Sequence, residues 1–381
     1  MDENIRQLVQ AIHDSPTHIV LVTAGAGTQA LSHLLGVAGA SRTLLEALIP
    51  YNQASFDDFL GQSPSQYVAD ETACLMAGRA YTRARWLLAA DSPVLGIACT
   101  ATIATDRPKR GEHRAHIALW QPEQLICHRL LLEKGTRDRA GEEDVISRQI
   151  INMLADACGL AASLPLSLAA ADSLTEIRYE FGKPVQALLR GELSYFSIED
   201  NGRLHTTNHL PQLLLSGSFN PLHAGHLEMA QTAAALTHKP VAFELPIANA
   251  DKPPLPQQTV LRRLAQFAGR HAIYVSTAPT FVEKSRLYPG TTFVVGYDTA
   301  LRILQPRFYQ NSQAIMLESL AKIKAQGCSF LVAGRVAENG RFHQASDLTI
   351  LQGFTDLFQP IPFRKDISSS ELRKTGQKGS R

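Results

Sequence analysis

Several features that would assign a chain to a class are scarce or missing among these 381 residues. No apolar run reaches the length of a membrane span, and the N-terminus carries acidic residues where a signal peptide would have an apolar core. The chain has 5 cysteines, without the CxxC spacing of a zinc site or the density of a disulfide framework. We therefore expect a cytoplasmic protein whose cysteines are mostly core thiols: Cys74, Cys99, Cys127, Cys158 and Cys328.

The charge of the chain is also nearly balanced, with a formal net charge of +2 at pH 7. A balance this small does not require nucleic acid or an anionic membrane as a partner, and we expect neither. The length allows two domains, each with a core of its own.

The most informative stretch of the sequence is residues 213–226, an apolar strand followed by a glycine turn, a proline and two histidines. A helix is expected from His223 onward, and its N-terminus attracts anions. His223 and His226 then share one face of its first turn, beside N–H groups that we expect to be bare at Gly217 and Ser218. The stretch predicts a polyphosphate site, although two histidines near a helix start are also typical of a cap or a solvated face.

The pattern G-x-F-x-P-x-H-x-G-H in residues 217–226 resembles the signature of the HxGH nucleotidyltransferases. That superfamily includes nicotinate- and nicotinamide-nucleotide adenylyltransferases, pantetheine-phosphate adenylyltransferase and the cytidylyltransferases. Residues 367–373, I-S-S-S-E-L-R, resemble the family's second motif, ISSTxxR, although a serine-rich helix start is also an ordinary cap. The two motifs occur in the expected order about 140 residues apart, close to the size of one α/β domain.

Short apolar runs at residues 241–246, 271–276, 292–296 and 329–335 read as strands between helical patterns. They predict a Rossmann-like, three-layer α/β/α domain with a parallel sheet over residues 209–381. In such sheets ligands bind beyond the carboxyl ends of the strands, where both motifs fall.

The resemblance assigns roles to individual residues. It implies that His223, His226 and Arg373 are catalytic. It implies ATP or phosphate contacts for Gly217, Ser218, Phe219, Ser368, Ser369, Ser370 and Arg335, and substrate contacts for Asn249, Lys252, Gly296 and Asp298. Lys252 is equally compatible with a solvated loop, and Asp298 with a strand cap.

The expected reaction is transfer of AMP from ATP to nicotinamide or nicotinate mononucleotide with release of pyrophosphate, a step of NAD biosynthesis. The partners are then ATP and a small mononucleotide. No cluster of metal-binding carboxylates is evident, so we expect Mg²⁺ to be held mainly by nucleotide phosphates, and no metal by protein side chains. Two alternatives stay open: the same chemistry with another acceptor or with CTP, and a regulatory protein that binds nucleotides without turnover.

Residues 1–165 resemble the CinA C-terminal family of nicotinamide-nucleotide amidohydrolases, through segments 34–41 and 63–78 and Tyr51. Ala24 takes the place of that family's nucleophilic serine, and Phe56 the place of its lysine. Because neither side chain can attack an amide or activate a hydroxyl, we predict an α/β domain that performs no hydrolysis.

Three roles stay open for this first domain: homo-oligomerisation, nucleotide sensing and presentation of substrate. Its glycine turn at residues 24–28 is a weak signal for a nucleotide loop. Hydrolysis by a relocated nucleophile, Thr23 or Thr28, is a further alternative. Residues 166–208 are expected to connect the domains and to contain a β-hairpin around Asn201-Gly202.

Overall fold

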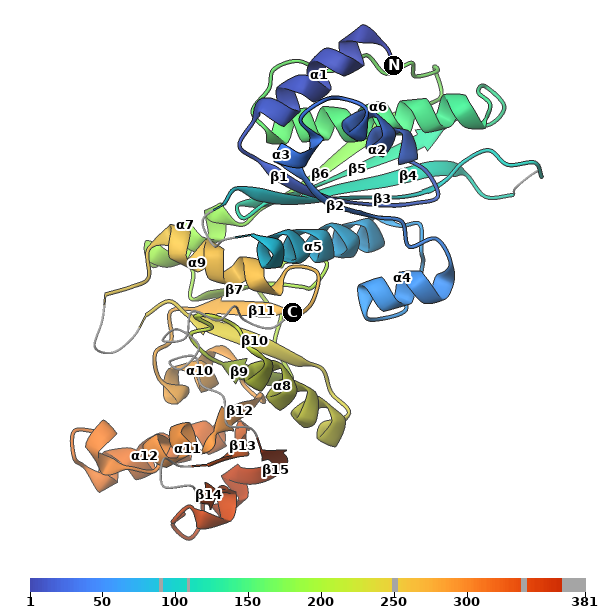
Figure 1. Cartoon of the computed structure of the whole chain (residues 1–381). Helices are drawn as coiled ribbons and strands as arrows, with labels where there is room; N and C mark the ends of the chain where they lie inside the picture. The colour runs from blue at the N-terminus through green and yellow to red at the C-terminus, as the bar shows by residue number, and fades with distance from the viewer. Residues whose placement is uncertain (89–91, 108–109, 249–252, 337–340, 365–381) are drawn as a thin grey trace. The chain divides into compact units, whose positions relative to one another are not determined.

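The computed structural model describes residues 1–88, 92–107, 110–248, 253–336 and 341–364. The chain divides into two compact units (Figure 1). The first consists of Met1–Gly182, Asp200–Arg203 and Phe267–Arg270, and the second of Lys183–Glu199, Leu204–Gln266 and His271–Arg381. Each unit contains a sheet covered by helices, which confirms the predicted α/β class with two domains. Among the described helices, none is both long and apolar enough to cross a membrane.

The first domain has a mixed sheet in the order β2-β1-β3-β4-β5-β6. The strands β1, β2 and β3 are parallel, whereas β4, β5 and β6 continue the sheet antiparallel. The strands are β1 (His18–Ala24), β2 (Leu44–Leu48), β3 (Val94–Thr102), β4 (His113–Trp120), β5 (Gln124–Leu132) and β6 (Ser173–Glu180).

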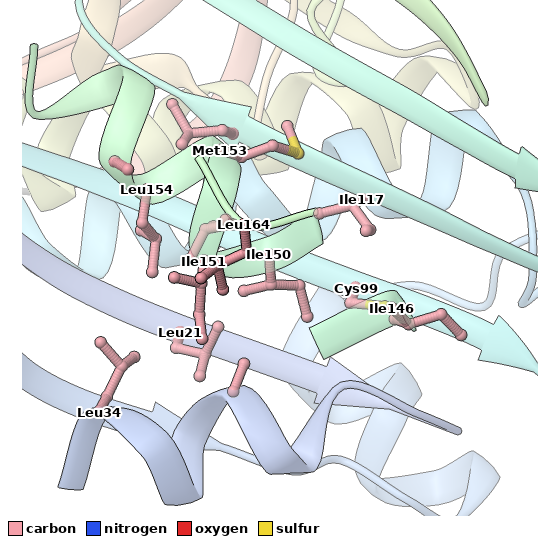
Figure 2. Packing of buried hydrophobic residues seen from close by; sticks show 14 of the residues in the cluster. Leu21, Leu34, Cys99, Ile117, Ile146, Ile150, Ile151, Met153, Leu154 and Leu164 are labelled. Carbon is pink, nitrogen blue, oxygen red and sulfur yellow. The ribbon is translucent and has the colours of Figure 1, made fainter. Parts of the chain in front are cut away.

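Helices cover both faces of this sheet (Figure 1). Residues of α1, α2 and α6 form one core with the strands, which Figure 2 shows around Ile150, Leu21 and Cys99, and α5 covers the other face. Four of the five cysteines are buried and all five are free thiols, as predicted. The helices are α1 (Glu3–Asp14), α2 (Thr28–Leu35), α3 (Ala40–Thr43), α4 (Gln53–Leu60), α5 (Asp70–Leu87) and α6 (Arg139–Ala157).

The sheet of the second domain has a parallel centre in the order β15-β13-β12-β9-β10-β11. Numbered within the domain, this is 6-5-4-1-2-3, the order of the doubly wound dinucleotide-binding fold. Antiparallel strands β7 and β8 extend one edge, and β14 pairs with β13 at the other. The strands are β7 (Tyr195–Ile198), β8 (Leu204–His205), β9 (Leu213–Ser216), β10 (Val241–Pro246), β11 (Ile273–Ser276), β12 (Thr292–Gly296), β13 (Ser329–Val336), β14 (Phe342–His343) and β15 (Phe358–Arg364).

Helices lie on both faces of this second sheet as well, so the predicted three-layer architecture is confirmed (Figure 1). Residues of α10, α11 and α12 build one core around Phe293, Phe330 and Tyr288. The opposite face is covered by α8. The helices are α7 (Gly182–Leu189), α8 (Ala224–Thr237), α9 (Gln257–Leu264), α10 (Phe281–Leu287), α11 (Tyr297–Ile303) and α12 (Gln313–Ala325).

The expected connector at residues 166–208 is not a separate segment. Strand β6 within it pairs with β5 and belongs to the first sheet. The predicted hairpin is present as β7 and β8, but β7 also pairs with β11, so the hairpin forms the edge of the second sheet. The prediction of a separate connector was wrong because the pairing of β6 and β7 with other strands depends on residues far away in the sequence, which local turn chemistry does not reveal.

Candidate active site

The order of the parallel strands locates the place where a ligand would bind in the second domain. The parallel neighbours β9 and β12 pair with Leu215 opposite Val294, and the strand order reverses between them: β10 and β11 follow on the side of β9, β13 and β15 on the side of β12. Ligands of doubly wound sheets bind in the crevice beyond the carboxyl ends of such a pair of strands. The segment 217–226 follows the end of β9. Gly296 ends β12 and Asp298 lies just beyond it, so both predicted groups lie at this switch point.

The turn after β9 is fixed by packing. Phe219 has a left-handed backbone (φ 43°) and a fully buried ring, which meets the rings of Phe243 and His226 edge-on. A Cβ on residue 217 would come within 2.8 Å of the Phe219 ring, which explains the glycine. The predicted bare N–H at Gly217 is wrong, because this group donates to the carbonyl oxygen of Glu244 at 3.0 Å. Its hydrogen bond continues the ladder of β9 and β10 by one residue.

Two further side chains hold this turn, and neither was predicted from the sequence. The Gln266 amide donates to the carbonyl of Phe219 at 2.9 Å, and its oxygen accepts from the N–H of Leu222 at 2.8 Å. Arg263, on α9, donates to the carbonyl of Ser218 at 3.0 Å and brings a guanidinium to the turn. Neither residue belongs to a motif, because their position depends on how α9 folds back toward the turn. Ser218 itself is exposed.

The two histidines lie together at the start of α8, with His223 as its N-cap and His226 in its first turn. Their rings stack with centroids 3.7 Å apart and planes at 28°. His223 is buried, at 5% exposure, and His226 is partly buried, so the pair is not a solvated face. The prediction that both imidazoles share one side of the helix start is confirmed.

The environment of His226 determines its protonation state. Burial lowers the pKa of this imidazole to about 3, and repulsion by the His223 ring adds to the effect. The backbone N–H of His223 donates to Nδ1 of His226 at 3.3 Å, which leaves the proton of the neutral ring on Nε2. His226 is therefore a neutral donor next to the positive end of the α8 dipole, an arrangement suited to an anionic oxygen.

A second polar group lies at the end of β12. Gly296 is the N-cap of α11, and Asp298 in the first turn of that helix forms an ion pair with Arg335 of β13. Both side chains of this pair are about half exposed, at 53% and 51%. The ring of Tyr297 packs into the core and stacks on His343, so it serves the fold.

Several predicted site residues lie outside the described residues, and their roles stay predictions. They are Asn249, Lys252, Ser368, Ser369, Ser370 and Arg373.

In the first domain, the glycine turn at residues 24–28 already holds an anion of the protein's own. The buried carboxylate of Glu143, on α6, accepts from the N–H of Gly27 at 3.0 Å and from that of Gln29 at 2.9 Å. It also accepts from the hydroxyl of Thr28 at 3.0 Å. Because Glu143 occupies the N-terminus of α2, this turn does not offer a phosphate site.

Ala24 and Phe56 both line one cavity of about 250 Å³. Phe56 is buried and meets the ring of Tyr67 edge-on, with centroids 5.2 Å apart. Of the alternative nucleophiles, Thr23 is 1% exposed, and the hydroxyl of Thr28 donates to Glu143. The Thr23 hydroxyl is therefore shielded from a substrate, and the Thr28 hydroxyl is one of several donors that the Glu143 carboxylate accepts at the start of α2.

Comparison with known proteins found a family model for the C-terminal region and solved structures for the N-terminal region. The family model described as cytidylyltransferase-like matches residues 214–375, and the C-terminal domain is nucleotidyltransferase-like. No curated protein sequence matches the chain.

Solved structures similar to the N-terminal region are CinA-family proteins. Competence/damage inducible protein CihA from Agrobacterium tumefaciens is 18% identical, with 41% of this chain and 97% of that chain covered at a TM-score of 0.36. CinA superfamily proteins from Enterobacter cloacae and Escherichia coli are each 16% identical over 41% of this chain. They are covered to 89% and 90%, at TM-scores of 0.33 and 0.32.

Proposed function

We propose that the second domain transfers AMP from ATP to nicotinamide or nicotinate mononucleotide and releases pyrophosphate. A phosphate oxygen of the acceptor attacks the α-phosphorus of ATP, a new P–O bond forms, and the bond to the β-phosphate oxygen breaks in line. No covalent enzyme intermediate is involved. The protein's task is to position two anions and to offset their repulsion.

The single observation that carries this proposal is the stacked pair of His223 and His226 at the N-terminus of α8, at the switch point of the sheet. The Nε2–H of His226 is a preorganised donor to an α- or β-phosphate oxygen, because its tautomer is fixed before the nucleotide arrives. His223 and the dipole of α8 act on the same phosphates. The cytidylyltransferase-like match over residues 214–375 supports the reaction class.

The remaining contacts of the proposal come from the segments that follow the strands. Strand β15 is parallel to β13, so its carboxyl end lies at the same edge of the sheet as those of β9 and β12. The motif at residues 367–373 begins three residues after β15 ends at Arg364. In the proposal, Arg373 and the serines hold the β- and γ-phosphates, and Lys252 the acceptor phosphate or the leaving group.

We propose that Mg²⁺ enters with the triphosphate. Asp298 is held by Arg335, so its carboxylate already has a cationic partner. Mg²⁺ commonly keeps its waters and binds chiefly to substrate phosphates, and there it would neutralise charge on the leaving pyrophosphate.

The test measures pyrophosphate release by the full chain with ATP or CTP and a panel of acceptors: nicotinamide mononucleotide, nicotinate mononucleotide and phosphopantetheine. We expect release with ATP and a pyridine mononucleotide, and the ratio of kcat/KM values identifies the preferred one. Pyrophosphate release only with CTP, or only with phosphopantetheine, would show that the proposed nucleotide or acceptor is wrong and that the reaction is still nucleotidyl transfer. Tight ATP binding that His226→Ala leaves unchanged, with no product from any acceptor, would favour a regulatory protein.

We also propose that the first domain performs no amide hydrolysis. Ala24 and Phe56 on its cavity, and the occupation of the α2 N-terminus by Glu143, support this. The full chain should release no ammonia from nicotinamide mononucleotide beyond an enzyme-free blank. Ammonia release that Thr28→Val abolishes would overturn the proposal and identify Thr28 as the nucleophile.

A further inference from the structure

A cluster of two histidines and one glutamate lies at the edge of the second sheet, outside the predicted nucleotide site. Glu199 follows β7, His205 ends β8, and His209 comes four residues later. One ligand atom from each, a carboxylate oxygen and two ring nitrogens, lies within 4.8 Å of the others. Nε2 of His205 is 2.9 Å from Oε1 of Glu199, and Nε2 of His209 is 3.7 Å from the same oxygen.

Strand register explains how these residues meet. His205 is opposite Ser197 in β7, and Ser197 is opposite Tyr274 in β11, so the three side chains share one face of the sheet. The segment after β8 brings His209 over this row, between its two outer rings. The His209 ring stacks on His205 with centroids 4.3 Å apart, and on Tyr274 at 5.7 Å with planes at 9°.

The other ring nitrogen of His209 is already oriented by buried groups. Its Nδ1 is 2.8 Å from the hydroxyl of Ser197 and 3.0 Å from that of Tyr274. Ser197 is fully buried and Tyr274 is 2% exposed, so these partners are fixed by the core. A histidine that binds a metal through one nitrogen almost always places the other in such a hydrogen bond, which sets the tautomer and aims the ring.

We propose that Glu199, His205 and His209 form a Zn²⁺ site with a fourth position open to water. Two imidazoles and one carboxylate are ligands that zinc prefers, at bonds of about 2.0–2.2 Å. Tetrahedral bonds of that length place ligand atoms about 3.3 Å apart. The separations of 2.9 and 3.7 Å from the Glu199 oxygen bracket this value. The two stacked imidazoles must also turn out of their near-parallel planes, now at 23°, for both nitrogens to face one ion.

The ion takes the place of the hydrogen bond between Nε2 of His205 and Oε1 of Glu199, and it joins both sides of the hairpin to the segment that enters β9. The exposures of the three side chains, 27% for Glu199, 27% for His205 and 35% for His209, leave a path for the ion and its water. Because the unfolded chain lacks this arrangement, bound Zn²⁺ stabilises the folded domain.

The experiment uses the full chain, stripped of metal with a chelator and desalted. Calorimetric titration with Zn²⁺ is expected to give one ion per chain and a rise in Tm, and Co²⁺ is expected to give the visible bands of a tetrahedral site. His205→Ala and Glu199→Gln should abolish both responses. Ser197→Ala, which removes an orienting partner and no ligand, should weaken binding by about 10- to 100-fold.

Two controls make the result specific to this cluster. His238→Ala removes an exposed histidine at the end of α8 and should leave zinc binding unchanged. His226→Ala tests the other close histidine pair and should also leave it unchanged. Absence of binding to the wild-type chain, or binding that survives His205→Ala and Glu199→Gln, would overturn the proposal. Binding lost only in His226→Ala would assign the ion to the nucleotide site and would overturn it as well.

Discussion

The two domains each contain a glycine turn that leads into a helix N-terminus, and the two turns differ in what occupies that end. In the first domain the N–H groups of Gly27 and Gln29 are bound by the carboxylate of Glu143. In the second, the start of α8 carries the stacked rings of His223 and His226. A glycine turn before a helix therefore indicates a site for an external anion only where no carboxylate of the protein already binds the N–H groups of that helix.

This comparison explains why we expect a nucleotide site at the second turn and none at the first. Glu143 lies 116 residues after Gly27, so no local pattern relates them. The histidines of the second turn are part of the turn itself, and their spacing is visible in the sequence. Three variants and one change of pH test this difference between the two turns, and we expect the largest effect from substitution of His226.

His226→Ala should lower kcat/KM for adenylyl transfer by about 100- to 1,000-fold, because it removes a preorganised donor to the reacting phosphates. The measurement is steady-state pyrophosphate release, with circular dichroism to establish that the variant is folded. His238→Ala, at the other end of α8, is the matched control and should retain full activity. A decrease in kcat/KM of less than about threefold in His226→Ala would show that the imidazole takes no part in the reaction.

Glu143→Gln should lower the free energy of unfolding by about 2 kcal/mol, since it replaces a charged acceptor that satisfies several buried donors. Urea unfolding followed by circular dichroism measures the change. Glu123→Gln, at an exposed position of the same domain, should change stability little. If the two variants are equally stable, the Glu143 carboxylate does not bind the N–H groups at the N-terminus of α2 in solution.

Gln266→Ala should lower kcat/KM about tenfold, a smaller effect than that of His226→Ala, because it loosens the turn without removing a phosphate donor. Gln266 is a positioning residue that holds Phe219 and Leu222. A merely structural role would lower Tm and leave the kinetics of the folded fraction unchanged. Gln258→Ala, exposed on α9, is the control for both measurements.

Acid should destabilise the wild-type chain through His226. Its pKa is about 3 when folded against a usual value of 6.5, so the unfolded chain takes up this proton first as the pH falls below 6.5. The resulting loss of unfolding free energy grows from pH 6.5 toward pH 3 and should reach about 1 kcal/mol at pH 5, allowing for partial exposure of the ring. Urea unfolding at pH 7.5 and pH 5 should therefore show a smaller difference for His226→Gln than for the wild type. Equal differences would mean that His226 titrates normally.

Much of the second domain could be predicted because its signals are local. Strands β10 and β12 occupy the predicted residues, and the helix after His223 begins where the motif indicates. Strand β15 was missed because Pro360 and Pro362 interrupt its apolar pattern; proline removes a backbone donor and is normally confined to sheet edges.

The site was predictable only where its residues are close in sequence. The turn and the histidine pair could be found from spacing, but Gln266 and Arg263 reach the turn through the packing of α9. The bare N–H expected at Gly217 was wrong because the pairing of β9 with β10 extends one residue further. The cluster of Glu199, His205 and His209 likewise depends on the register of three strands.

The most direct test of the account follows the imidazole nitrogens of His226 by NMR during addition of an ATP analogue with a methylene group between the α- and β-phosphates. Hydrogen bonding to a phosphate oxygen should shift the Nε2 resonance of His226 saturably, while the resonances of the exposed His238 stay in place. A His226 resonance that does not move when the protein is saturated with the analogue would contradict the account.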